Sequence, residues 1–403
     1  MRREYQIAAI MAISAFFTLA GYEFIRSSST VLFKEAYGAE NLPLVMAAIP
    51  FVVFLGVALY GHILTLVGPA KTLLITSLGS SLLIAVCYLL IRLGVKEITP
   101  VLYLLKEFYI VLLIEQYWSF INSHLKSDTA RKVNGPITGI SGLGAGVGGW
   151  LVSYTAEPLG TETMILMAAI FILPAAVVSS YAYRRFGEPE HEHQAATGDM
   201  GWRLFRENPV LAYLLAIVIS TQIVAATLDF KFQEILSLEF AGDRDKETAF
   251  QGWFFGTLSV SSLVLQFVIA PLLLSFFKLR WIHILMPVVH VTTITFAIIE
   301  PSLLSVGIAF FLFKSMDYSL FRAAKEILYI PFSFDVRYRA KEVIDVFGYR
   351  SGKGGSSVII AILQRGGVVM GNYYLAIAYA ATIVWLFLIF PLTHHFSEQE
   401  KDR

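Results

Sequence analysis

Long apolar stretches recur along the whole 403-residue chain and constrain its fold more than any other feature. Each runs for about 20 residues or more, and an α-helix of that length crosses a hydrocarbon core of roughly 30 Å. Only 15% of the residues are charged, whereas soluble domains carry about 25%. The mean hydropathy of +0.66 agrees with this. The pattern therefore predicts an all-α membrane protein.

Twelve apolar segments are expected to span the membrane, in two sets of six. The first set lies near residues 5–31, 43–66, 70–93, 99–124, 134–155 and 162–184. The second set lies near residues 209–239, 248–277, 280–299, 302–331, 341–364 and 372–393. We therefore expect an N-terminal half (1–185), a polar cytoplasmic linker (186–208) and a C-terminal half (209–403). No small-residue cleavage site follows the first segment, which predicts a retained helix instead of a removed signal peptide.

The distribution of basic residues predicts the orientation of the chain. When both termini are placed in the cytoplasm, the inside loops hold 17 of the 31 Lys and Arg residues, and the outside loops hold six. Cytoplasmic loops of membrane proteins carry such an excess of basic residues. The bias therefore favours cytoplasmic termini and an even number of helices.

The two halves resemble each other at an offset of 210 residues. Ser141, Gly142 and Gly144 align with Ser351, Gly352 and Gly354, which superimposes the fifth segment on the eleventh. The stretch from Gly61 to Lys71, between the second and third segments, resembles a reduced form of the major-facilitator loop motif. A parallel repeat of two six-helix halves is the organisation of major-facilitator transporters. We therefore expect a fold of that type.

Charged residues inside the apolar segments indicate a polar transport route, because a charge at mid-bilayer costs several kcal/mol unless it faces a cavity or a partner. Glu23 and Arg26 are three residues apart, so they can pair on one helix face. Ideal helical periodicity places Lys314, Arg322 and Lys325 on one face of the tenth segment. The alternative for each single charge is an internal salt bridge. The set as a whole favours an anion site, because Arg and Lys both suit phosphate or carboxylate.

Glycine is concentrated in the fifth and eleventh segments. Seven glycines lie between Gly135 and Gly149, several of them four residues apart. Small residues let helices approach closely. The pattern predicts close helix packing, which we interpret as rocking contacts between the halves.

Two stretches carry a resemblance to a known family. The run from Lys314 to Pro331, and the later run Ala340–Val346 with Arg350–Ser356, are similar to a signature of the ATP/ADP translocases of plastids and intracellular bacteria. Glu107, the run Tyr117–Asn122 and the run Leu228–Lys231 resemble further elements of that family. The resemblance implies a major-facilitator-type secondary transporter that exchanges ATP for ADP and phosphate, or that imports nucleotides with protons.

By residue, the resemblance implies that Glu107, Asp229, Lys325 and Lys353 occupy positions whose charges are tied to transport. The first segment departs from the family. The family has an R-D-x-K-D element where this chain has Arg26 followed by Ser27, Ser28, Ser29 and Thr30, so a cation expected to meet phosphate is missing. The chain is also shorter than usual members.

The leading hypothesis is a secondary transporter of an anionic, nucleotide-type metabolite in the bacterial inner membrane. Its expected partners are the anionic substrate, the lipid bilayer and possible coupling protons, and we expect a monomer without nucleic-acid binding, cofactor or metal. The predicted substrate-binding residues are Arg26, Lys231, Arg322, Lys325, Arg350, Lys353, Tyr22, Tyr117, Trp118 and Tyr318. The predicted coupling residues are Glu107, Glu115, Asp229 and Asp345.

Two alternatives to this hypothesis stay open. One is a major-facilitator transporter of another organic anion or a lipid-like amphiphile, which the missing first-segment lysine favours. The other is a non-transporting membrane sensor or assembly factor. An enzyme is not expected, because no Ser/His/Asp or Cys/His set is present and the stretch Gly352–Ser356 lacks the spacing of a phosphate-binding loop.

Overall fold

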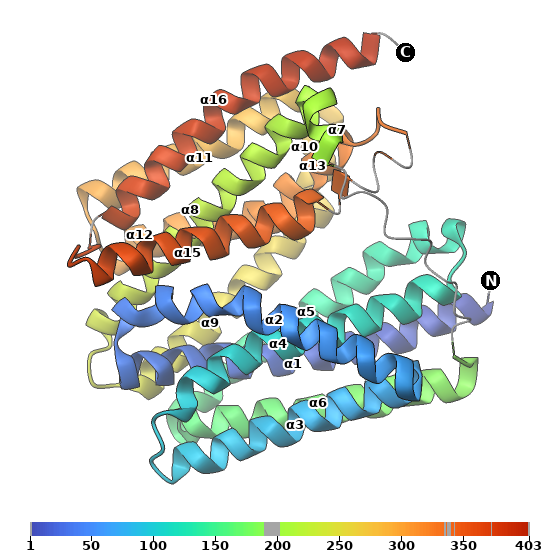
Figure 1. Ribbon diagram of the computed structural model, residues 1–403, viewed down its shortest axis with the longest axis vertical. Helices are drawn as coiled ribbons and strands as arrows, with labels where there is room; N and C mark the ends of the chain where they lie inside the picture. The colour runs from blue at the N-terminus through green and yellow to red at the C-terminus, as the bar shows by residue number, and fades with distance from the viewer. Residues whose placement is uncertain are drawn as a thin grey trace. The chain divides into compact units, whose positions relative to one another are not determined.

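The computed structural model describes residues 2–188, 202–333, 336, 340–341, 343–371 and 373–401, and every regular element in these ranges is a helix. Figure 1 shows their order. The elements of the first part of the chain are α1 (Arg2–Tyr37), η1 (Ala39–Asn41), α2 (Leu42–Val67), α3 (Pro69–Arg92), α4 (Ile98–His124), α5 (Ser127–Leu159) and α6 (Thr161–Phe186). The others are α7 (Trp202–Glu207), α8 (Pro209–Glu239), α9 (Arg244–Val264), η2 (Leu265–Ile269), α10 (Ala270–Phe276), α11 (Leu279–Ile299), α12 (Leu303–Met316), η3 (Asp317–Phe321), α13 (Arg322–Leu328), η4 (Val343–Gly348), α15 (Tyr349–Arg365) and α16 (Tyr373–Lys401).

Nine helical stretches within the described ranges are long and apolar enough to cross a membrane. This confirms the predicted all-α membrane protein. Three further predicted spans correspond to α4, α5 and η4–α15, which are helical but carry more charged or small residues. The count of twelve spans therefore stays a prediction. Residues 189–201 of the predicted linker lie outside the described residues.

The contacts divide the chain into two compact units. The first unit comprises Met1–Asn41, Ala48–His193 and Phe240–Val260, and the second comprises Leu42–Ala47, Gln194–Glu239 and Ser261–Arg403. The segment Phe240–Val260, most of it in α9, therefore groups with helices that precede it by many residues. The division by chain order into halves 1–185 and 209–403 stays a prediction.

In the first unit, α1 is the central helix. It lies against α4, α5 and α6, and α3 lies against α4 and α6 (Figure 1). Tyr109 and Ile165 belong to one fully buried apolar cluster of this unit, and Phe120 belongs to a second cluster. Because α1 is enclosed on several sides, the polar side chains in its middle, among them Glu23, Ser27 and Ser28, are buried between helices.

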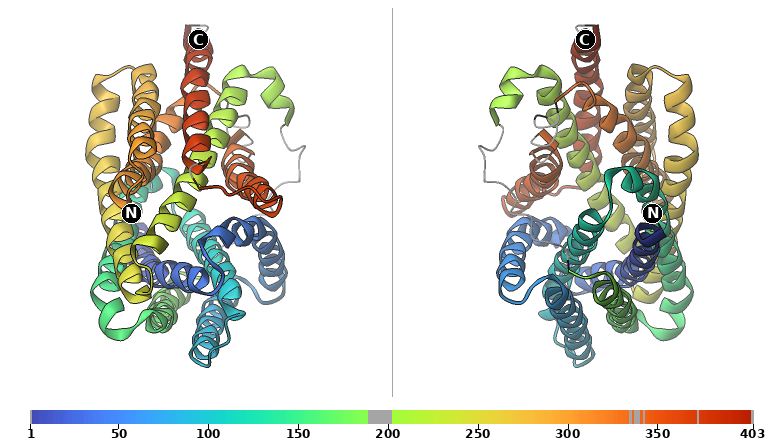
Figure 2. Two further views of the ribbon diagram at one scale, coloured as in Figure 1. Left: turned by 90° about the vertical axis from the view of Figure 1, so that its left-hand side faces the viewer. Right: turned by 90° about the vertical axis from the view of Figure 1, so that its right-hand side faces the viewer.

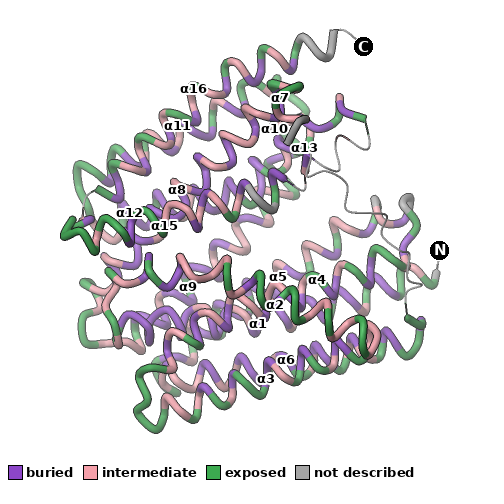
Figure 3. Tube along the Cα trace, in the orientation of Figure 1, coloured by how far each residue is buried: buried purple, intermediate pink, exposed green. Residues whose placement is uncertain are grey.

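In the second unit, α8 has the corresponding place. It lies against α12, α15 and α16, and α11 lies against α12 and α16 (Figure 2). Most of the residues of α8 are buried or half-buried, as the colours of Figure 3 show.

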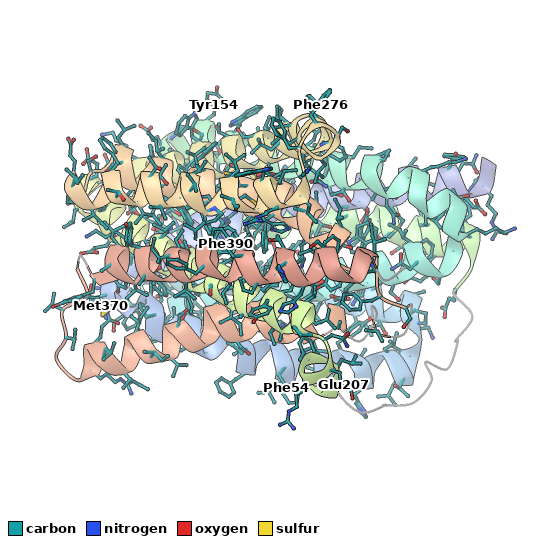
Figure 4. The ribbon with its side chains drawn as sticks, turned by 90° about the horizontal axis from the view of Figure 1, so that it is seen from above. Phe54, Tyr154, Glu207, Phe276, Met370 and Phe390 are labelled. Carbon is teal, nitrogen blue, oxygen red and sulfur yellow. The ribbon has the colours of Figure 1, made fainter. Side chains whose placement is uncertain are left out.

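In both units, large aromatic side chains project outward, among them Phe54 on α2, Tyr154 on α5 and Phe276 on α10 (Figure 4). Such exposed apolar surface suits lipid and not water.

The glycines of α5 allow two helices to approach its backbone. An added Cβ at Gly148 would lie 2.4 Å from the carbonyl oxygen of Ala20 on α1. One at Gly149 would lie 2.5 Å from the Cα of Gly256 on α9. Both contacts are with backbone, which cannot move aside like a flexible side chain. The predicted close packing is therefore confirmed, while rocking at these contacts stays a prediction.

Replacing Gly148 by alanine is expected to destabilise the protein by about 1–3 kcal/mol, because the new methyl group overpacks the α1–α5 contact. The matched control is Gly79→Ala on α3, where an added Cβ meets no atom within 4 Å. The control is expected to stabilise the helix by about 0.5–1 kcal/mol through reduced backbone entropy. Thermal unfolding of both variants in detergent measures the difference. Equal transition midpoints would contradict the packing described above.

Candidate functional site

Glu23 and Arg26 pair on α1, as their spacing predicted. Arg26 Nη1 lies 3.3 Å from Glu23 Oε1, and the guanidinium stands 3.5 Å from the ring centroid of Phe255 on α9. The other carboxylate oxygen of Glu23 is buried, with no hydrogen-bond partner in the described part of the chain. Arg26 is therefore occupied by a carboxylate and an aromatic face, and both interactions offset its charge.

Lys106 and Glu107 form a second pair, on α4. Lys106 Nζ lies 3.5 Å from Glu107 Oε1 and 3.5 Å from the ring centroid of Tyr103. It also donates a hydrogen bond of 3.4 Å to Thr30 on α1. Lys106 is buried, whereas Glu107 is only half-buried. Glu107, a predicted coupling residue, thus forms an ion pair with the residue that precedes it in the sequence.

The other predicted residues of the first unit lie in different surroundings. Tyr22 is half-buried, and its ring centroid is 6.5 Å from that of the buried Tyr109. Tyr117 belongs to the apolar core, with Trp118 packed against its ring at 5.2 Å. Glu115 is exposed. The residues predicted on α4 therefore do not share one environment, and the burial of Tyr117 favours a packing role.

A network of charged and polar side chains joins the start of α9 to the C-terminal end of α1 and to the start of α6. Lys34 on α1 forms an ion pair with Glu247, and both side chains are buried. Arg244 lies 3.0 Å from Glu35 and also pairs with Glu162 at the start of α6. These partners lie far apart in the sequence, so no local spacing could have indicated the network.

Hydrogen bonds from the start of α6 also hold the start of α9. The backbone N–H and the hydroxyl group of Thr161 both donate to Asp245 Oδ1, at 2.7 and 2.6 Å. The Thr161 hydroxyl also lies 3.0 Å from that of Thr248. The first turn of α9 is therefore held by hydrogen bonds as well as by ion pairs.

In the second unit, the charges of α8 lie near its C-terminal end. Lys231 is buried and lies 3.2 Å from Glu234 Oε2, one turn further along the helix. Asp229 is half-buried and forms no ion pair with any described residue. Lys231 therefore has a carboxylate partner of its own, as the salt-bridge alternative proposed.

The tenth predicted span is interrupted by the π-helix η3, which the sequence did not predict. The wider π turn shifts the register between Lys314 and the residues of α13. Lys314 and Lys325 are buried, whereas Arg322 is exposed. The regular α-helical spacing between Lys314 and the pair Arg322 and Lys325 is therefore interrupted by η3. All three cations still act electrostatically on the buried Asp317, and their common role in a substrate site stays a prediction.

Lys325 on α13 meets Asp345, which lies in another π-helix, η4. They form an ion pair in which Lys325 is buried and the Asp345 side chain is 40% exposed. Lys325 Nζ also lies 5.0 Å from the ring centroid of Tyr349, a residue that the sequence analysis missed. Two of the three π-helices among the described residues carry an acidic residue, Asp317 in η3 and Asp345 in η4. Such turns occur frequently at functional sites.

Asp317 is a further group that the sequence did not single out as a site. Its side chain is buried, and its Oδ1 atom has no hydrogen-bond partner among the described residues. Lys314 lies within electrostatic range of it and has its Nζ atom 5.3 Å from the ring centroid of Tyr318. Tyr318 itself is exposed. This tyrosine, a predicted substrate-binding residue, thus stands beside a cation.

Arg322, Arg350 and Lys353 differ from the other predicted cations. In the part of the chain that the structure describes, none of the three forms an ion pair with a carboxylate. Arg322 and Arg350 are exposed and Lys353 is half-buried. Arg350 and Lys353 are three residues apart on α15, so they lie on neighbouring positions of one helix surface. Arg322 also acts electrostatically on the buried Asp317, and a substrate-binding role for the three cations stays a prediction.

Comparison with known proteins gives a match to a family over part of the chain, and a shared fold. Residues 211–396 match the model of a family described as TLC ATP/ADP transporter. ADP,ATP carrier protein 1 of Chlamydia pneumoniae is 24% identical to the chain, covering 69% of it and 62% of the carrier. The carrier of the same name from Chlamydia trachomatis is 27% identical, covering 71% of the chain and 63% of the carrier. The chain thus spans less than two thirds of the length of these relatives.

Solved structures with the same fold are transporters of different kinds. The nucleoside transporter NupG aligns with a TM-score of 0.65 at 11% identity, covering 97% of this chain and 99% of that one. A bacterial metal transporter aligns with a TM-score of 0.67 at 14% identity, covering 96% and 98%. At such low identity the likeness concerns the fold alone. It confirms the predicted major-facilitator-type fold.

Proposed function

We propose that this chain, a divergent relative of the ATP/ADP translocase family, is a secondary transporter of a nucleotide-type anion. The match over residues 211–396 confirms the family resemblance that the sequence motifs predicted. Transport would proceed by alternating access, as exchange or as proton symport. The relatives are longer, so the substrate is part of the proposal and not carried over from their names.

The observation that carries the proposal is the set of cations Arg322, Arg350 and Lys353. A cation near the membrane interior without a carboxylate partner is costly, and an anionic substrate would offset that cost when it binds. Arg can hold phosphate oxygens with two parallel hydrogen bonds, and Lys supplies a point charge. All three residues lie inside the region that matches the family. They are therefore the proposed ligands of the substrate's negative groups.

The remaining predicted residues have supporting roles in this proposal. Glu107, Asp229 and Asp345 would couple protons or countercharge. Glu107 and Asp345 are each paired with a lysine that could change partner, and Asp229 is half-buried with no ion pair to a described residue. Tyr318 is exposed and could stack on a base. We propose further that the protein is a monomer in the bacterial inner membrane with both termini in the cytoplasm, as the distribution of basic residues favours.

The test is exchange of radiolabelled ATP or ADP by proteoliposomes that contain the purified protein. Uptake that depends on nucleotide inside the vesicles would support exchange, and uptake driven by an imposed pH gradient would support symport. A chain that neither takes up any nucleotide nor gains thermal stability from one would contradict the proposal.

A second candidate substrate is an organic anion with fewer negative charges than ATP. Arg26 is engaged by Glu23 and Phe255, and Ser27, Ser28 and Ser29 are completely buried in place of a cation. In the membrane-spanning part of the first helix, Arg26 and Lys34 are therefore both paired with carboxylates. A thermal-shift panel separates the candidates: stabilisation by carboxylates or monophosphates but not by ADP or ATP would favour this one.

A further inference from the structure

A groove lies along the α10–α11 hairpin in the second unit. It measures about 520 Å³, which is within the usual range for ligand sites of roughly 300–1,000 Å³. Its lining is entirely apolar: Leu273, Phe277, Trp281, Ile282, Ile284, Leu285 and Val288. Such a groove on a membrane helix pair would hold a hydrocarbon chain and not a nucleotide.

The hairpin carries positive charge at one end of this groove. Between Glu247 and Glu300 the only charged residues of the chain are Lys278 and Arg280, and both are exposed. Neither forms an ion pair with a described residue. The guanidinium of Arg280 lies 5.4 Å from the ring centroid of Phe390 on α16, which holds it beside the hairpin. The turn is therefore a basic patch that no carboxylate neutralises among the side chains that the structure describes.

Two further features suit an anion at the same end. Lys278 is the N-cap residue of α11, and no side chain caps the helix there, so its first backbone N–H groups and positive dipole end face the turn. Trp281 is 61% exposed next to the cations. Tryptophan concentrates at the level of the lipid headgroups. The cations, the helix start and the indole ring thus mark a headgroup position, from which the apolar groove leads away.

We propose that the α10–α11 hairpin is a binding site for an anionic phospholipid. The phosphate group contacts Lys278 and Arg280, and one acyl chain lies in the groove between Phe277 and Val288. The positive-inside distribution places this turn on the cytoplasmic side, where anionic lipids attract basic residues next to the membrane. The proposal does not depend on what the protein transports.

Native mass spectrometry of the detergent-purified protein, titrated with phosphatidylglycerol or phosphatidylcholine, tests this site. The double variant Lys278→Gln/Arg280→Gln is expected to bind phosphatidylglycerol about 30-fold more weakly, since each cation contributes roughly tenfold or less. Its affinity for phosphatidylcholine should stay unchanged. The control is Arg365→Gln, which removes another exposed cation, at the end of α15, and should have no effect.

A second variant tests the groove separately from the charges. Leu285→Trp is expected to fill the groove and to weaken phosphatidylglycerol binding while Lys278 and Arg280 remain. Leu285 is 42% exposed, so the larger side chain can be accommodated without disturbing the core. Equal binding of the two lipids by the unmodified protein would overturn the proposal. So would an equal loss of binding in the Arg365→Gln control.

Discussion

Replacing Glu247 by glutamine is expected to lower the free energy of unfolding by about 3–5 kcal/mol, because it removes the carboxylate charge that faces the buried Lys34 ammonium. The Lys34 side chain is only 2% exposed and that of Glu247 only 7%. Gln251, one turn further along α9, also donates to Glu247 Oε1, at 3.3 Å. The substitution therefore removes a charge on which two buried donors depend.

The matched control for this change lies at the same end of α9. Asp243 and Lys246 form an ion pair of 2.7 Å whose side chains are 42% and 58% exposed. The hydrogen bond from Lys246 holds the pKa of the Asp243 carboxyl below its ordinary value. Because water solvates both partners, Asp243→Asn is expected to leave the transition midpoint in detergent unchanged. A similar loss in both variants would contradict a special role for burial.

A double variant distinguishes the effect of an unpaired buried charge from a general disruption of the fold. Lys34→Met together with Glu247→Leu removes both charges and keeps apolar volume, and such replacements are often neutral or stabilising. The double variant is therefore expected to recover most of the midpoint that Glu247→Gln loses. A further loss in the double variant would show that the surrounding hydrogen bonds, and not the charge pair, hold α9 in place.

The Lys34–Glu247 pair also marks the limit of what the sequence could predict. Local spacing predicted the Glu23–Arg26 pair correctly, because residues three apart on a helix are neighbours. Lys34 and Glu247 are separated by 213 positions, so their pairing depends on how helices assemble. Repeated apolar stretches predicted the helices for the same reason, because helix formation depends on residues that are close in sequence. Which helices pack against each other does not depend on such local spacing.

The π-helices are a second feature that the sequence could not predict. Apolar periodicity predicted helical structure through Lys314–Lys325, but a single wider turn leaves almost no trace in hydropathy. It nevertheless changes the register between Lys314, which precedes η3, and Arg322 and Lys325, which follow it. Charges in this region could be found from sequence, whereas their burial and pairing could not.

Arg350→Gln and Lys353→Gln are each expected to raise the KM for nucleotide about 10- to 100-fold, with a smaller effect on the maximal rate. Each substitution removes one charge-assisted hydrogen bond to the substrate, which contributes about 1.5–3 kcal/mol. Neither side chain has a carboxylate partner among the described residues, so removing it strands no buried counter-charge. The protein should therefore keep its thermal stability. Labelled-nucleotide uptake by proteoliposomes, measured over a range of substrate concentrations, gives both constants.

Two further variants separate substrate binding from general electrostatics. Arg365→Gln changes the net charge by the same amount on the same helix, α15, and should leave KM unaltered. Lys353→Arg keeps the charge and is expected to restore part of the affinity, because a guanidinium also binds phosphate. If Arg350→Gln and Lys353→Gln transport like the unmodified protein while uptake itself is intact, these two cations do not bind the substrate. The buried, paired cations of α8 and α13 would then be the next candidates, since an arriving phosphate could displace Glu234 from Lys231 or Asp345 from Lys325.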